Sequence, residues 1–210
     1  MQPRMDLEPM SLKKLSLLVT TVFIASYTNA DKSGGNIELG FSGGGDKIGT
    51  KSDSDYKYEA GSGVYLMGGM GTSITERYYL KGRIGLRTGY DEYKSYPGGQ
   101  NTGRVSLLEF PIDVFAGVIS DDGKHHAGIG LTTNLYSKVR CSIKDTCDEE
   151  ANYSTSIAPS FEYLYHYNGA RYISIRLTRG INYKSSDADY DSSQNLIQLG
   201  WGVNGLAILK

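Results

Sequence analysis

The segment Tyr78–Tyr90, with the sequence YYLKGRIGLRTGY, shows most clearly the pattern from which the fold is inferred. Leu80, Ile84 and Leu86 share one parity along it, whereas charged residues occupy the other. Alternation with a period of two is typical of a β-strand with two unlike faces. The pattern leaves one question open, because the apolar face points inward in a soluble barrel and outward in a membrane barrel.

Residues 1–30 are predicted to be a secretory signal peptide. Two lysines precede the apolar run Leu15–Ala25, and small residues follow the run up to Ala30. A basic start, a short apolar run and a small-residue cleavage site are typical of such a signal, and the run is shorter than the about 20 residues of a spanning helix. We expect cleavage after Ala30 and take Met10 as a candidate true start. The alternative is an amphipathic or membrane-anchoring N-terminal helix.

The mature domain, residues 31–210, carries almost no net charge. Removing the three basic and two acidic residues of the signal from the totals of 22 and 23 leaves 19 basic and 21 acidic residues, a net charge of −2. Without a basic field, nucleic acid is not expected as a partner.

The two cysteines, Cys141 and Cys147, stand six positions apart in RCSIKDTC. In an exported protein this spacing indicates a small disulfide loop. A metal site would require further Cys or His ligands nearby, and the segment has none.

Alternating stretches recur along the mature domain and are separated by breaks rich in Gly, Asp, Ser and Asn. They predict eight β-strands. The predicted strands are 36–44, 58–70, 77–90, 104–120, 126–139, 153–167, 171–183 and 195–209. Connections after the second, fourth and sixth strands are short, whereas the others are longer and polar. This sorting is typical of transmembrane barrels, which have short periplasmic turns and longer external loops.

The two faces of the predicted strands differ in a way that favours a membrane barrel. One parity is mostly small and polar, whereas the other is apolar, as in Ile173, Ile175, Leu177 and Ile181 of the seventh strand. The outer face of a soluble barrel would be expected to carry many Lys and Glu residues. An eight-stranded barrel has room inside for small and medium side chains only. We therefore expect the apolar face to contact lipid.

Tyrosines gather at the ends of the predicted strands and predict two aromatic belts at the membrane interfaces. Those near the short turns are Tyr78, Tyr79, Tyr165, Tyr167 and Tyr172, and those near the long loops are Tyr56, Tyr58, Tyr90, Tyr93, Tyr153 and Tyr183. The alternative is that tyrosine is simply favoured in strands.

Eight charged residues fall on the lumen-facing parity and are predicted to form a paired network. They are Glu38, Lys81, Arg83, Arg87, Glu109, Asp113, Glu162 and Arg176. A symmetric hairpin about Pro97 would place Lys81 opposite Asp113, with Arg83 and Arg87 flanking Glu109 diagonally. The turn near Asn168 would set Glu162 close to Arg176. Four acidic and four basic charges predict a plugged lumen rather than an ion-selective ring.

These features resemble those of the small eight-stranded outer-membrane barrels of Gram-negative bacteria, the OmpX/OmpA-like "porin family" barrel domains. The segment LLEFPIDVFAG, residues 107–117, looks like a strand found in many of them. The resemblance implies an all-β, eight-stranded antiparallel transmembrane up-and-down β-barrel in the outer membrane. The C-terminal sequence LGWGVNGLAILK departs from the family, whose members usually end in an aromatic residue that the insertion machinery reads.

No residue constellation for catalysis can be assembled from the sequence, so we expect no enzyme, no cofactor and no metal site. His125 and His126 fall in a predicted periplasmic turn, and His166 lies near the periplasmic end of its strand. The acidic segment Asp187–Asp191, together with Asp55 or Glu149, lacks the spacing of an EF-hand calcium loop.

The function expected from the sequence is a structural or surface-interaction role through the long external loops. The expected partners are outer-membrane lipids and an unknown external ligand, with the protein as a monomer. Two alternatives stay open, a small porin and a barrel enzyme that modifies lipid or peptide.

Overall fold

The computed structural model describes residues 33–44, 47–48, 58–59, 62–94, 102–143, 147–185 and 191–204. No helix among these residues is long and apolar enough to cross a membrane. The strands are β1 (Ser33–Gly43), β2 (Lys47–Ile48), β3 (Tyr58–Glu59), β4 (Gly63–Ser73), β5 (Tyr78–Lys94), β6 (Thr102–Ile119), β7 (His125–Ile143), β8 (Cys147–Thr155), β9 (Ala158–Asn168), β10 (Arg171–Ser185) and β11 (Asp191–Asn204).

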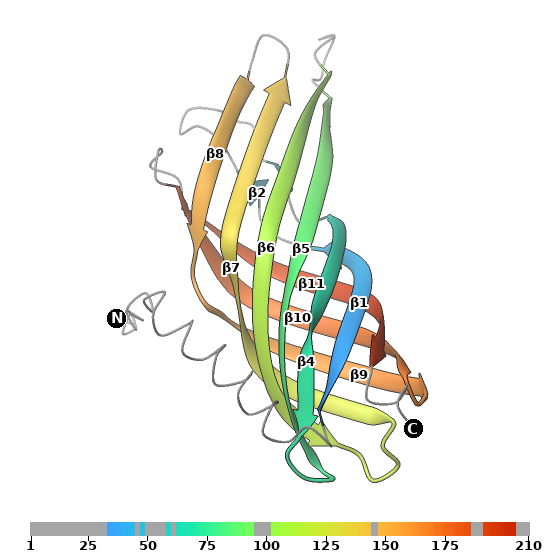
Figure 1. Ribbon diagram of the computed structural model, residues 1–210. Helices are drawn as coiled ribbons and strands as arrows, with labels where there is room; N and C mark the ends of the chain where they lie inside the picture. Colours follow the sequence, from blue (N-terminus) through green and yellow to red (C-terminus); the bar gives the residue numbers. More distant parts are fainter. Residues whose placement is uncertain are drawn as a thin grey trace, which may run out of the picture.

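The strands form a closed antiparallel barrel (Figure 1). Consecutive barrel strands pair with each other, and β11 also pairs with β1, which closes the sheet. β8 and β9 fill one position of the barrel, because both lie between β7 and β10 and are separated only by residues 156–157. The barrel therefore has eight strand positions, and the fold predicted from the sequence is confirmed.

The strand bounds differ from the prediction mainly on the side of the long connections. β2 and β3 pair with each other, so Tyr58–Glu59 belongs to the first long connection and the second barrel strand begins at Gly63. β5, β6, β7 and β8 extend into segments that the sequence suggests are loops, and the last barrel strand is described as far as Asn204. The polar residues of these extensions resemble loops in sequence because the strands leave the apolar band there.

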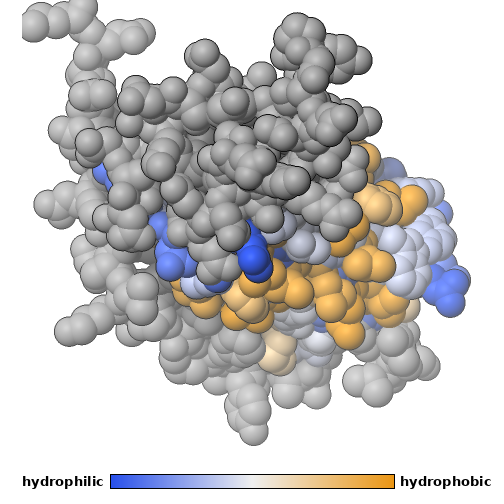
Figure 2. Space-filling view, turned by 90° about the horizontal axis from the view of Figure 1, so that it is seen from above, coloured by the Kyte–Doolittle hydropathy of each residue, from blue (hydrophilic) through white to orange (hydrophobic). Residues whose placement is uncertain are grey.

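The outer surface of the barrel wall is apolar, as Figure 2 shows on the side in view. Exposed side chains on outward positions include Ile37, Leu39, Phe41, Ile84, Leu86, Ile129, Ile173, Leu199 and Trp201. Leu86 is 40% exposed, whereas its neighbour Arg87 is 1% exposed. The apolar parity thus faces outward, as a barrel in lipid requires.

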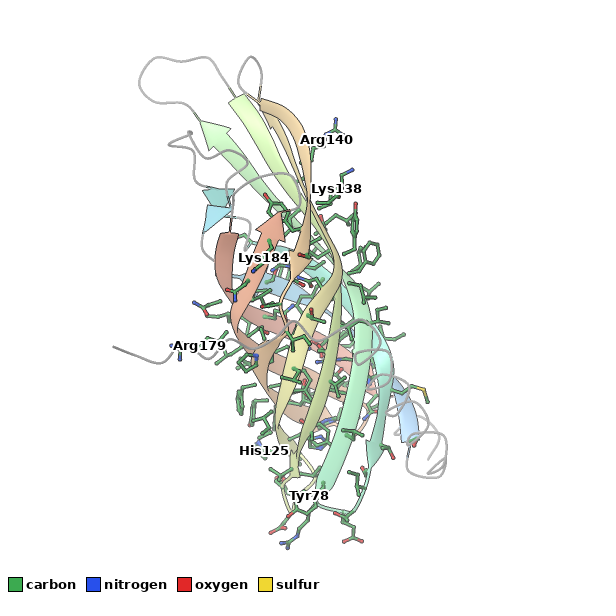
Figure 3. All side chains as sticks on the ribbon, turned by 90° about the vertical axis from the view of Figure 1, so that its left-hand side faces the viewer. Tyr78, His125, Lys138, Arg140, Arg179 and Lys184 are labelled. Carbon is green, nitrogen blue, oxygen red and sulfur yellow. The ribbon has the colours of Figure 1, made fainter. Side chains whose placement is uncertain are left out.

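Polar outward residues lie beyond this apolar surface (Figure 3). Lys138, Arg140 and Lys184 lie toward the end with the long connections, whereas Tyr78 and His125 lie near the short turns. By the usual asymmetry of such barrels, the short turns face the periplasm and the long connections face the cell exterior.

The face predicted for one apolar residue, Ile181, was wrong. Gly180 has a φ of 73°, and the register of β10 against β11 shifts between Thr178 and Ile181. A bulge of this kind adds one residue and reverses the parity of the strand beyond it. Ile181 is consequently buried in the barrel, at 1% exposed, and does not face lipid with Leu177 as expected.

The aromatic belts are only partly as expected. Tyr78, Tyr165 and Tyr167 near the short turns are exposed, and the Tyr167 hydroxyl accepts a hydrogen bond of 2.6 Å from Nε1 of Trp201. Three other tyrosines assigned to the belts point into the barrel instead, because they lie on the lumen parity: Tyr79, Tyr153 and Tyr172. The remaining belt tyrosines have side chains outside the described part, or lie outside it entirely: Tyr56, Tyr58, Tyr90, Tyr93 and Tyr183.

The turn between β6 and β7 is held by its own side chains. The Ser120 hydroxyl donates to the carboxylate of Asp122, and that carboxylate also accepts from the Lys124 backbone N–H at 3.0 Å. These two hydrogen bonds lower the pKa of Asp122, because they stabilise its charged form. The turn fixes the point at which β7 begins, and with it the positions of His125 and His126.

Candidate functional site

The candidate site is the interior of the barrel, which all eight of the predicted lumen charges occupy. Each of these side chains is buried, with an exposed fraction of 5% or less. They come from β1 (Glu38), β5 (Lys81, Arg83, Arg87), β6 (Glu109, Asp113), β9 (Glu162) and β10 (Arg176). The strand period of two explains their shared orientation, since the residues on each strand have equal parity.

Arg83 is the centre of the network and contacts three carboxylates. Its Nε and Nη2 atoms lie 3.0 and 3.1 Å from the two oxygens of Asp113, which is a bidentate pair. Its Nη1 atom lies 2.8 Å from Oε2 of Glu38, and Nη2 lies 2.9 Å from Oε2 of Glu162. The planar guanidinium suits this role, because it presents five donors in fixed directions.

Two more cations complete the central cluster. Nζ of Lys81 lies 2.6 Å from Oε1 of Glu162. The Arg176 guanidinium lies 2.9 Å from Oε1 of Glu38 and 3.3 Å from Oδ2 of Asp113, and it donates to the amide oxygen of Gln198 at 3.0 Å. Three cations thus face three carboxylates, so the cluster is neutral.

Arg87 and Glu109 form a second pair nearer the external end. Nε of Arg87 donates to Oε2 of Glu109 at 2.6 Å. The other carboxylate oxygen accepts from the Asn134 amide and from the Ser137 hydroxyl, both at 3.1 Å. Ionised groups in a narrow interior need such partners, because an unpaired buried charge is costly.

Aromatic side chains fill the space between the charges. The Phe115 ring centre lies 5.6, 5.7 and 5.9 Å from the cationic groups of Arg83, Arg176 and Lys81 respectively. Such positions attract cations to the ring face. The hydroxyls of Tyr65 and Tyr79 donate to Glu38 and Glu162, at 2.9 and 3.1 Å. The charges are therefore set in a packed interior.

Glycines on facing positions make this packing feasible. A Cβ atom at Gly130 would lie 2.6 Å from the Phe115 ring, and one at Gly40 would lie 2.6 Å from the Tyr65 ring; at both positions it would lie closer still to a backbone carbonyl oxygen of the neighbouring strand. A glycine beneath an aromatic ring lets the ring lie against the barrel wall. The strand-interior glycines seen in the sequence are thus explained at these two positions.

The hairpin register predicted from the sequence was wrong by two residues. Arg83 lies opposite Asp113 and Arg87 lies opposite Glu109, whereas Lys81 lies opposite Phe115. The error comes from the assumption that the loop is symmetric about Pro97. Because the shift is of two residues, every side chain nevertheless stays on the face that was predicted for it.

The second expected pair is close in register but is bonded differently. Arg176 is the direct cross-strand neighbour of Glu162, as expected. The ion pairs of Glu162 nevertheless go to Lys81 and Arg83 on β5, and those of Arg176 go to Glu38 and Asp113. Contacts across the lumen thus replace the expected contact between neighbouring strands.

The predicted disulfide and the acidic segment considered for calcium binding lie outside what the structure describes. The backbone register places Cys141 opposite Glu149 and Cys147 opposite Ile143, but both sulfur atoms are in the undescribed part. The disulfide therefore stays a prediction. Asp55 and residues 187–190 are outside the described ranges, as are the side chains of Glu149 and Asp191.

The three histidines lie at the periplasmic end. His125 points outward, and its Nδ1 atom lies 2.6 Å from the Tyr163 hydroxyl. His126 and His166 lie on the lumen parity, with ring centres 4.3 Å apart. Within the described ranges, no group of three or more His, Cys, Asp or Glu side chains is arranged to hold a metal ion.

Sequence reasoning missed the polar residues that complete the network, namely Tyr65, Asn134, Ser137 and Gln198. The parity of Asn134 assigns it to the lumen, but nothing in the sequence links it to Glu109. The register shift between Glu109 and Pro111 brings Ser137 opposite Glu109. Such a bulge has no clear sequence signal here.

The architecture is similar to that of solved outer-membrane proteins. Ail, the attachment invasion locus protein of Yersinia pestis, in a complex with the heparin analogue sucrose octasulfate, matches with a TM-score of 0.53 at 13% identity, over 82% of this chain and 99% of that chain. A major outer membrane protein from Thermus thermophilus matches with a TM-score of 0.52 at 12% identity, over 82% and 98%. No protein-family model matches the sequence, and no curated protein matches it significantly.

Sequence identities this low show the fold alone. The environment of the barrel is inferred from the character of its two faces. An apolar outer wall around a polar, charge-paired interior is the arrangement of a barrel that spans an outer membrane. The chain therefore has the fold of the small eight-stranded outer-membrane β-barrels, together with the apolar outer wall and polar interior that suit a membrane.

Proposed function

We propose that this protein is a monomeric surface-interaction protein whose plugged barrel anchors it in outer-membrane lipid, and that it acts by binding rather than by catalysis. The observation that carries the proposal is the sheet formed by β5, β6, β7 and β8 beyond the barrel (Figure 1). The pairing of β4 with β5 ends at Gly63 and Gly89, whereas β5 and β6 stay paired as far as Lys94 and Thr102.

On each of the two outer strands of this sheet, one edge is not paired with any described strand. On β5 this segment is Tyr90–Lys94, and on β8 it is Cys147–Asn152. Unpaired backbone N–H and C=O groups at a sheet edge accept a further strand, which is a recurrent way of binding an extended peptide. The ligand we propose is therefore an extended segment of an external protein.

The closed lumen supports binding over transport. Eight strands leave no open aqueous channel, and here six central charges and the Phe115 ring fill the cross-section. The fold is compatible with the role, since the Yersinia pestis protein of similar fold is named for attachment.

The test separates binding from conduction. Peptide phage display against the protein in lipid nanodiscs is expected to enrich peptides that bind the wild type. Binding should be lost in a variant whose β5–β6 hairpin is shortened to the barrel rim by replacing residues 91–104 with a tight turn. A matched control replaces residues 75–76 of the periplasmic turn, which should leave binding unchanged.

Planar-bilayer recordings provide the opposing outcome. The wild type is expected to show no steady conductance. Reproducible open channels, with selectivity that changes in Arg83 or Glu109 variants, would replace this proposal with a small porin. Peptide binding that survives removal of the β5–β6 extension would show that the extended sheet is not the binding element.

A further inference from the structure

Four aromatic rings form a ladder across the periplasmic end of the lumen. Tyr79, His126, His166 and Tyr172 follow one another with ring-centre distances of 5.6, 4.3 and 5.2 Å. They come from β5, β7, β9 and β10. The two imidazoles form the central pair, and their contact is the shortest of the three. Neither imidazole takes part in the charge network.

The His126 imidazole is held through one ring nitrogen by the turn that precedes its strand. Nε2 of His126 lies 3.3 Å from the carbonyl oxygen of Gly123. A carbonyl only accepts, so Nε2 of His126 carries the proton and its Nδ1 atom carries the lone pair. Histidines that bind metals usually have their second ring nitrogen fixed in this way.

Nε2 of His166 is buried and has no hydrogen-bond partner among the residues that the structure describes. Both histidines line a cavity of about 50 Å³, together with Asn36, Thr72 and Lys81. Oδ1 of Asn36 and Oγ1 of Thr72 are also buried without a partner. Because one water molecule needs roughly 10–15 Å³, this cavity can hold an ion with a few water molecules.

The charge next to the cavity does not oppose a cation strongly. Nζ of Lys81 is compensated by Glu162, at 2.6 Å from Oε1. The remaining polar groups at the cavity, from Asn36, Thr72, Tyr172 and Asn204, are uncharged. Buried polar atoms without partners favour occupation of the cavity by something that they can coordinate.

We propose that His126 and His166 form a binding site for a divalent transition-metal ion of the kind that prefers imidazole in tetragonal geometry, Cu²⁺ or Ni²⁺. Two imidazoles that bind one ion at about 2.0 Å place their ring centres about 4.5 Å apart at an angle of about 90° and about 5.1 Å apart at a tetrahedral angle. The observed distance of 4.3 Å, with the two ring planes tilted by 34°, is closer to the tetragonal value than to the tetrahedral one. Water and the Asn36 amide oxygen complete the coordination.

The chain suits a direct test, because its only three histidines are His125, His126 and His166. Untagged protein in detergent micelles, treated with an alkylating reagent to block any free thiol, is titrated with Cu²⁺ by calorimetry and by electron paramagnetic resonance. We expect one ion per chain, with hyperfine splitting from two imidazole nitrogens. His126→Phe and His166→Phe keep a ring in the ladder and should each weaken binding at least tenfold.

The matched control is His125→Phe, which changes the exposed neighbour of His126 and should leave the affinity unchanged. Equal affinity in all three variants, or loss of binding in the His125 variant, would assign the ion to the surface. Absence of saturable binding would show that water fills the cavity. Folding of the phenylalanine variants is judged by heat-modifiable gel migration. If they do not fold, the wild-type spectrum decides: two coordinated imidazole nitrogens support the proposal, and a single one overturns it.

Discussion

Replacing Arg83 with methionine should destabilise the barrel more than any exposed charge deletion. The change keeps the length of the side chain and removes the cation that contacts Glu38, Asp113 and Glu162. Lys81 and Arg176 then face three carboxylates alone, so the buried cluster acquires a net charge of −1. Breaking a buried pair by removing one partner costs about 3–5 kcal/mol, because the partner that stays is buried without compensation.

This cost corresponds to a decrease of roughly a hundred-fold to a few thousand-fold in the ratio of folded to unfolded protein, at about 1.4 kcal/mol per factor of ten. Arg83 lies at the upper end of the range, since it makes four hydrogen bonds to three carboxylates. The matched control is Arg77→Met, which removes an exposed pair with Asp121 of 3.1 Å. Exposed pairs contribute about 0–1 kcal/mol.

The assay is unfolding by guanidinium in detergent, followed by the fluorescence of Trp201. This residue is the only tryptophan in the chain, and it lies on the outer wall, 47% exposed. A rescue variant, Arg83→Met with Asp113→Asn, removes one carboxylate and restores neutrality, so it should recover part of the loss. The central role of Arg83 is refuted if Arg83→Met lowers the free energy of unfolding no more than Arg77→Met does, or if the rescue variant is less stable than the single one.

Three further predictions concern the whole domain. Freshly purified protein should contain no free thiols, and thiols that titrate would contradict the disulfide. Replacing Cys141 and Cys147 with serine should lower the free energy of unfolding by less than the typical ~2–4 kcal/mol, because the closed loop is short. Membrane fractionation should recover the mature chain from the outer membrane with Asp31 as its first residue, and a soluble periplasmic product would refute export into the membrane. Gly130→Ala should destabilise the barrel by about 1–3 kcal/mol through overpacking, because the new Cβ would meet the Val114 carbonyl oxygen and, at 2.6 Å, the Phe115 ring; it is measured beside Gly43→Ala, whose Cβ would meet nothing within 4 Å.

The fold was predictable because its signals are local. A period of two, read over each strand, assigns a face to every residue without knowledge of its partners, and the lengths of the connections assign the two ends. The same reasoning placed eight charges in the lumen. It failed for Ile181, where Gly180 adopts a positive φ and the bulge reverses the parity. Glycine occurs so often in these strands that its presence alone does not mark the bulge.

The pairing of the charges was not predictable, because it depends on closure of the sheet. Arg176 and Glu38 are 138 positions apart, and they meet because β11 closes the barrel onto β1. Lys81 reaches Glu162 across the lumen, from a strand three positions away in the sheet. The stagger of the strands in a closed barrel decides which side chains share one level, and it follows from every hairpin register together. A two-residue error in one hairpin therefore leaves the face of each residue correct and changes its partners.

That distinction explains why neutrality could be anticipated while the contacts could not. Burial requires compensation of each charge, and this requirement applies to any register that keeps the charges inside. Four acids and four bases satisfy it as a set, whichever pairs form. The geometry then selects a cluster centred on Arg83, since its guanidinium reaches carboxylates from β1, β6 and β9 at once. One side chain thereby links three separate parts of the barrel wall, and its removal is expected to weaken the closed sheet as a whole.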